Sequence, residues 1–130
     1  MNMGQCYSII LKVKVNDEAG LVKALQNKIS RAETERVQYN LDHFAELGIG
    51  TGTLEDLFRI FFAGWEGKFT STPDGKLLSD FDCSYGWENV MITAFDEIAP
   101  YLKDNSYIKI YSDSGCDYAK IKNGEAVWKS

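Results

Sequence analysis

Residues 77–122 read LLSDFDCSYGWENVMITAFDEIAPYLKDNSYIKIYSDSGCDYAKIK, and this stretch decides the fold. Its first part, 77–85, places side chains alternately on two faces, which is typical of a strand with one buried face. A helix is expected next, because apolar residues then recur at helical spacing, namely Val90, Met91, Ala94, Phe95 and Ile98. Alternation returns over 107–111, and a turn at 113–115 leads to a further strand over 117–122. The stretch therefore predicts strand, helix, strand, turn and strand, the pattern of an α+β fold.

Upstream of this stretch, the chain predicts a strand and then two or three helices. Residues 7–15 alternate strictly and read as a half-buried strand. The stretch 31–47 is polar at first and then becomes apolar at helical spacing, with Val37, Leu41, Phe44 and Ala45. The most amphipathic helix is expected after Thr53, with Leu54, Leu57, Phe58, Phe61 and Phe62 on one side.

Capping signals mark where these helices begin and end. Asn16 or Asp17 is expected to cap the first helix, and Thr53 begins a capping-box-like Thr-x-x-Asp pattern. Ser84 is expected to cap the helix that follows the strand at 77–85, and Gly48 is expected just after an earlier helix.

Two turn sequences predict hairpins. Pro73-Asp74-Gly75 joins 68–72 to 77–85, and Asn123-Gly124 joins the last two strands. The resulting order matches the ferredoxin-like split β-α-β plan, in which an antiparallel sheet carries helices on one face. Here the plan has an enlarged helical first crossover and a C-terminal β-hairpin. We expect one such α+β domain over residues 1–130.

Composition indicates a soluble, cytoplasmic protein without a cofactor. The three cysteines, Cys6, Cys83 and Cys116, are widely spaced and make a poor disulfide framework. No cysteine pair has the spacing of a zinc site and His43 is the only histidine, so neither a metal nor another cofactor is expected. Residues 1–5 lack the features of a secretory signal, and the longest apolar stretch, 60–63, cannot span a bilayer.

No catalytic motif is evident, so the chain is not expected to be an enzyme. A nucleophile and its base would require His43 close to a cysteine or serine, and no motif surrounds His43. Asp80 and Asp82 share one face of their strand, but metal-assisted chemistry needs further carboxylates to converge on them. The spacing Gly48-x-Gly50-x-Gly52 is not that of a phosphate-binding loop.

A family resemblance rests on the C-terminal half. Its components are FDCSYGW at 81–87, the helix up to Pro100, the strand at 107–111, Gly115, and the turn sequence KNGE at 122–125. This arrangement resembles the YubB-type ferredoxin-like domain of small proteins from plasmids, phages and integrated elements. The resemblance implies a mobile genetic element and action inside a bacterium, and it carries no catalytic residues.

The leading functional hypothesis is a non-enzymatic interaction protein that binds a basic protein surface. Residues 40–104 carry twelve acids and four bases, a net charge of −8 within a chain of net charge −5. Acidic surfaces attract basic ones, and aromatic side chains then anchor the complex. With the resemblance, this suggests an anti-CRISPR-like inhibitor that occupies the nucleic-acid groove of a host defence nuclease. The expected partner-binding residues are Asp42, Glu46, Glu55, Asp56, Asp80, Asp82 and Glu88, with Trp65 and Trp87 as anchors.

The alternative hypothesis is a module that binds single-stranded nucleic acid. One face of the sheet is expected to stay uncovered and to carry aromatic residues interleaved with bases, namely Tyr107, Lys109, Tyr111, Tyr118 and Lys120. Domains that bind single strands stack bases on such aromatic residues and hold the phosphates with lysine and arginine.

Overall fold

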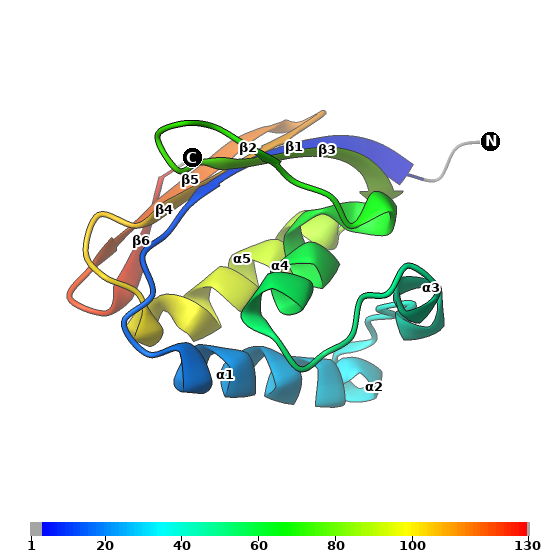
Figure 1. The fold of residues 1–130 in the computed structure, drawn as a ribbon. Coiled ribbons are helices and arrows are strands. Elements are labelled where there is room, and N and C mark those ends of the chain that lie inside the picture. The colour runs from blue at the N-terminus through cyan, green and yellow to red at the C-terminus, as the bar shows by residue number, and fades with distance from the viewer. Residues whose placement is uncertain (1–3, 130) are drawn as a thin grey trace.

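The computed structural model describes residues 4–129. The expectation that residues 1–5 are not a secretory signal falls partly on residues 1–3, which lie outside the described range, as does Ser130. The described chain has an α+β architecture with two layers (Figure 1). One layer is an antiparallel sheet of six strands in the order β2-β3-β1-β4-β5-β6, and the other contains five α-helices. No helix in this range is long and apolar enough to cross a bilayer.

The sheet is built around β1 (Gly4–Lys12), which pairs with β3 (Leu77–Ser84) on one side and with β4 (Tyr107–Ser112) on the other. The short β2 (Thr70–Ser71) completes the predicted hairpin with β3. At the opposite edge lie β5 and β6, whose bounds are Gly115–Lys122 and Glu125–Lys129. The predicted terminal hairpin is therefore confirmed, and it extends the sheet.

Three predicted helices begin or end close to where the sequence indicates. In α1 (Glu18–Ser30), the side chain of Asp17 accepts a hydrogen bond from the Gly20 amide. The Thr53 hydroxyl caps α4 (Leu54–Phe62) in the same way. The fifth helix, α5 (Trp87–Ile98), buries the predicted apolar stripe against the sheet and α4.

The helix expected within 31–47 is confirmed only at its end, where Gly48 follows with a positive φ, because two short helices replace a single one. They are α2 (Ala32–Glu35) and α3 (Leu41–Glu46), and Arg36 and Asn40 adopt left-handed backbone conformations between them. The break brings Tyr39 into the core, where it packs edge-on against Phe61. The apolar spacing of Val37 with Leu41 therefore belongs to a loop and a helix, and not to one helix.

Ser84 does not cap α5. It is the last residue of β3, and the chain reaches α5 through Tyr85 and Gly86, with Gly86 at φ 90° as the residue before the first helical turn. Cys116, which lies between the predicted turn at 113–115 and the predicted strand at 117–122, is within β5.

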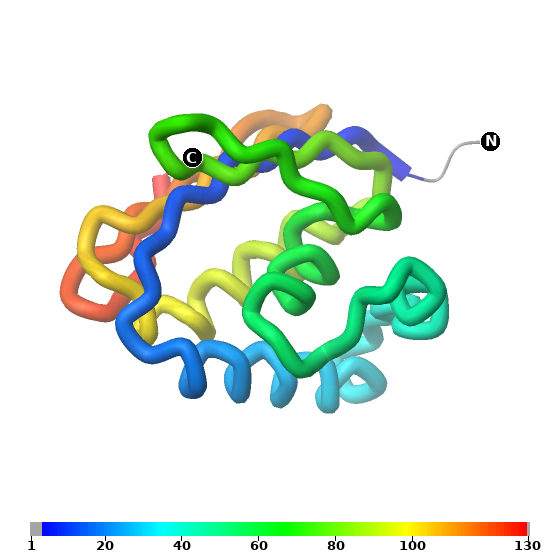
Figure 2. Tube along the Cα trace, in the orientation of Figure 1, coloured from blue at the N-terminus to red at the C-terminus, as the bar shows by residue number. Residues whose placement is uncertain are grey.

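The core lies between the sheet and the helices. Figure 2 traces the chain from β1 down to α1, through α2 and α3 at the far end, and back toward the sheet through α4. Four ionised side chains tie α1, α2 and α5 together, namely Lys28, Arg31, Glu35 and Glu97. The helices cover one face of the sheet, while the opposite face has no helix of the described chain against it (Figure 1).

Candidate functional site

The uncovered face of the sheet carries lysine and tyrosine in a regular pattern. Residues paired across antiparallel strands point to the same face. One row across β1, β4, β5 and β6 is Lys12, Tyr107, Lys120 and Val127; the next is Ile10, Lys109, Tyr118 and Lys129. Lysine and tyrosine thus alternate along β4 and β5 and also between these strands. We define the basic sheet face as Lys12, Tyr107, Lys109, Tyr118, Lys120 and Lys129.

The geometry of the basic sheet face keeps its charges available. The Lys109 ammonium lies 5.9 Å from the ring centre of Tyr107 and 5.5 Å from that of Tyr118. The two ring centres are 6.1 Å apart. Within residues 4–129, the ion pairs involve other cations, so no carboxylate neutralises these lysines. Such a surface can contact flat aromatic groups and phosphates together.

The same face becomes acidic toward β3. Asp80 is paired with Ser8 and Asp82 with Cys6, and each carboxylate accepts a hydrogen bond from its partner's side chain. Because Asp82 accepts a hydrogen bond from the thiol and carries a negative charge, it raises the pKa of Cys6. Cys6 is therefore held in the protonated form, which is a weak nucleophile. Tyr111, which pairs with Ser8 between the basic sheet face and these two aspartates, is exposed.

The predicted acidic residues do not form a single surface. Asp80 and Asp82 project from the sheet face that faces away from the helices, whereas Asp42 and Glu46 lie exposed on α3 in the helical layer. Two others, Glu55 and Asp56, lie at the start of α4, and the Asp56 carboxylate is paired with Arg59 at 3.0 Å. A version of the inhibitor hypothesis in which all of these acids occupy one groove is therefore not compatible with this fold.

Glu88, also predicted to be a partner-binding residue, is engaged inside the protein. Its carboxylate accepts hydrogen bonds from the Tyr7 hydroxyl at 2.5 Å and from the Gln5 amide at 3.0 Å. Tyr7 and Gln5 are both buried, so Glu88 joins the start of α5 to β1. These hydrogen bonds hold the Glu88 carboxylate between α5 and β1, so its charge contributes little to the outer surface.

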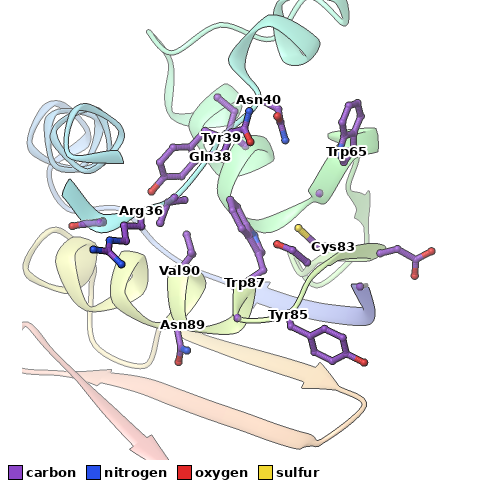
Figure 3. Close-up of a pocket in the computed structure, with 18 of the residues that line it drawn as sticks. Arg36, Gln38, Tyr39, Asn40, Trp65, Cys83, Tyr85, Trp87, Asn89 and Val90 are labelled. Atoms are coloured by element: carbon purple, nitrogen blue, oxygen red, sulfur yellow. The ribbon is translucent and has the colours of Figure 1, made fainter. Parts of the chain in front are cut away.

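A groove of about 760 Å³ opens at the end of the sheet where β3 leads into α5 (Figure 3). Tyr39 and Trp87 form its floor and contact each other edge-on, with ring centres 5.8 Å apart. The segment 36–40 borders one side, and Gly64, Trp65 and residues 82–85 border the other. We use "the groove" for this site.

Trp65 and Trp87, the two predicted anchors, both line the groove but differ in exposure. Trp87 is 8% exposed and donates a hydrogen bond from Nε1 to the Phe61 carbonyl at 3.1 Å. Trp65 is 51% exposed and contacts the His43 ring at a tilt of 50°, with ring centres 3.6 Å apart. His43 Nε2 also lies 2.8 Å from the Trp65 carbonyl oxygen. Trp87 is therefore a core residue that forms the floor, and Trp65 is a surface residue held in place on the rim.

Sequence reasoning missed the groove itself. Its floor residue Tyr39 follows the break between α2 and α3, which the helical pattern concealed. The alternation over 77–85 assigns Tyr85 only to one face of a strand, yet its side chain is 65% exposed on the groove rim. The one sequence signal that points here is Tyr85-Gly86-Trp87, because glycine readily adopts the left-handed conformation of the turn that leaves Tyr85 exposed and Trp87 buried.

Metal binding and thiol reactivity each depend on how the histidine, cysteine and carboxylate side chains of residues 4–129 are placed. No group of three histidine, cysteine, aspartate or glutamate side chains in this range is arranged to hold a metal ion. Cys83 lies beside the groove, where burial raises the pKa of its thiol and disfavours the reactive thiolate.

No protein-family model matches the chain, and no curated protein or solved structure matches it significantly. The resemblance to the YubB-type domain therefore stays a prediction.

Proposed function

We propose that this protein binds single-stranded nucleic acid through the basic sheet face. The observation that carries the proposal is the alternation of lysine and tyrosine across the paired strands β4 and β5, flanked by Lys12 and Lys129. Unpaired bases have exposed rings that stack on tyrosine, and the adjacent lysines are placed to neutralise phosphates. A flat sheet face favours single strands, since a duplex hides the faces of its bases.

The two aspartates on the same sheet face limit where a nucleic-acid strand can bind. Asp80 and Asp82 repel phosphate, so a bound strand is expected to follow β4 and β5 and to avoid β3. The overall charge of −5 is a sum over both layers, and Asp42, Glu46, Glu55 and Asp56 belong to the helical layer on the other side of the sheet. Salt screens charges that are separated by more than about 8–10 Å at physiological ionic strength.

The order of the first four strands supports a finer description of the fold. The arrangement β2-β3-β1-β4, with helices inserted after β1 and after β3, is the order of a ferredoxin-like sheet. We propose that β1 to β4 form such a unit, that α1 to α4 enlarge its first crossover, and that β5 and β6 extend it. A cytoplasmic location, an origin in a mobile element and inhibition of a defence nuclease stay predictions.

The test is fluorescence anisotropy with a labelled ten-nucleotide oligothymidine and its RNA counterpart at several salt concentrations. Contact with about three phosphates predicts a slope near −2 when the logarithm of the association constant is plotted against that of salt concentration. Tyr118→Ala should weaken binding at least about fivefold, because a base–aromatic stack contributes about 1–3 kcal/mol. Tyr85→Ala is the matched control, since it removes an exposed tyrosine from the groove. Absence of binding at low salt, or equal loss in both variants, would overturn the proposal.

A further inference from the structure

Three of the six exposed large apolar side chains in residues 4–129 line the groove or the hollow next to it. Trp65 and Tyr85 line the groove, and Leu41 lines the smaller hollow that adjoins it beneath Trp65. Leu47 follows at the end of α3, whereas Tyr111 and Val127 lie on the separate sheet face. Exposed apolar side chains at a concave site are typical of a surface that binds another protein.

The floor of the groove is rigid and leaves one polar atom unsatisfied. Tyr39 is 4% exposed and packs against Phe61 and Trp87, yet its hydroxyl has no hydrogen-bond partner. Figure 3 shows this hydroxyl directed to the side of the groove where Arg36 lies. Buried hydroxyls are nearly always hydrogen-bonded in native proteins, so this orphan leaves the floor of the groove one hydrogen bond short.

The wall formed by β3 also offers main-chain hydrogen-bonding groups. On the outer side of β3, β2 pairs only with Leu77 and Leu78. The next part of that edge is covered by the chain after α4, because the Ser79 hydroxyl donates to the Phe62 carbonyl and Gly64 packs on Phe81. Residues 82–84 line the groove without a neighbouring strand in the described chain. An extended peptide recognises such an edge through its own backbone.

Charge at the rim restricts the sequence of such a peptide. Asp42 lines the hollow that adjoins the groove. Glu46 is exposed one helical turn after Asp42, and Glu66 is exposed next to Trp65. None of these three carboxylates forms an ion pair within residues 4–129, and Arg36 is the one cation on the groove rim that is equally unpaired. The rim therefore favours a cationic partner.

From these four observations we propose that the groove binds an extended segment of a partner protein, in which a bulky apolar side chain is flanked by lysine or arginine. The apolar side chain would rest on Trp87 beside Trp65, and the backbone would follow residues 82–84. The flanking cations would face Asp42, Glu46 and Glu66. This site is separate from the basic sheet face, so each can fail without the other.

A displayed library of random twelve-residue peptides, selected on the whole chain, tests the proposal. Peptides that also bind the double variant Trp65→Ala/Tyr85→Ala are removed by counter-selection. Both side chains are at least half exposed, so the double variant is expected to keep its fold, and thermal unfolding checks this. The enriched peptides should share an aromatic or long apolar residue next to lysine or arginine. Synthetic copies should bind the double variant at least tenfold more weakly than the parent chain, whereas Tyr111→Ala, on the sheet face, should bind them like the parent.

Amide chemical shifts give an independent readout of where the synthetic peptides bind. Saturable shifts are expected at residues 82–87 and at the Trp65 indole, with none at β5. Failure to enrich any peptide, enrichment of acidic peptides, or affinity that is equal for parent and double variant would each overturn the proposal. Shifts confined to β4 and β5 would do the same, and would leave the nucleic-acid proposal unaffected.

Discussion

The groove and the basic sheet face are held in place by different parts of the molecule. The groove takes its floor from the core, since Trp87 and Tyr39 are buried residues that also contact Phe61. The basic sheet face uses side chains that point away from the core, on strands whose opposite side is anchored by Ile108 and Ile110. Changes in the groove floor should therefore alter stability and binding together, whereas changes on the sheet face should alter binding alone.

The largest effect is expected at the groove floor. Trp87→Ala removes a buried indole and its hydrogen bond to the Phe61 carbonyl, so the free energy of unfolding should fall by about 3–5 kcal/mol. Urea denaturation measures this. Trp65→Ala, on the rim of the same groove, should cost less than about 1 kcal/mol because half of its surface is already exposed. Similar losses in the two variants would contradict the separation of floor from rim.

Two buried tyrosines offer a second comparison, with a smaller effect. The Tyr7 hydroxyl bonds Glu88, Gln5 and the Ser84 carbonyl, whereas the Tyr39 hydroxyl has no partner. Tyr7→Phe should therefore lower the free energy of unfolding by about 1–3 kcal/mol, because it leaves the Glu88 carboxylate poorly satisfied. Tyr39→Phe removes an unsatisfied group and should leave stability unchanged or raise it. A clear loss of stability in Tyr39→Phe would show that this hydroxyl has a partner in solution.

The sheet face could be predicted from sequence because its determinants are local. Alternation with a period of two assigns Tyr107 and Lys109 to one side of their strand, and the Asn123-Gly124 turn fixes the register of the last hairpin. The capping residues Asp17 and Thr53 were also predictable, because each bonds an amide three residues away.

The groove and the distribution of acids could not be predicted, because both depend on contacts between distant residues. Glu88 accepts a hydrogen bond from Tyr7, which is 81 positions away in the sequence. Nothing near Glu88 in the sequence therefore shows that its carboxylate has a partner inside the protein. Arg36 and Asn40 adopt left-handed conformations without a glycine, which concealed the break that brings Tyr39 into the core. A cluster of acids in the sequence likewise does not specify on which side of the sheet each acid will lie.

The same two tyrosines predict a loss of stability in alkali. Burial raises the pKa of both, and for Tyr7 the hydrogen bond to Glu88 raises it further. A phenol with a raised pKa in the folded state keeps its full stabilising effect below pH 10, the ordinary tyrosine pKa, and loses it as the pH rises above that value. The free energy of unfolding should thus fall by about 1.4 kcal/mol per pH unit for each tyrosine. Urea titrations between pH 9 and 11 measure the slope, and Tyr39→Phe should reduce it; an unchanged slope would contradict the burial of this phenol.

The smallest change in the free energy of unfolding is expected for substitutions on the basic sheet face. A substitution there that leaves stability unchanged allows its effect on binding to be measured separately. Lys120 is exposed and has no ion pair within residues 4–129, so Lys120→Gln should change the free energy of unfolding by less than about 0.5 kcal/mol. If Lys120 binds one phosphate, the same substitution should reduce the magnitude of the salt slope for oligothymidine binding by about 0.7. Lys23→Gln makes the same charge change on the exposed side of α1 and should leave the slope unaltered. Equal slopes in the two variants would mean that binding responds to net charge and not to the basic sheet face. A difference confined to Lys120→Gln, without loss of stability, would show that this face can be changed independently of the core on which the groove depends.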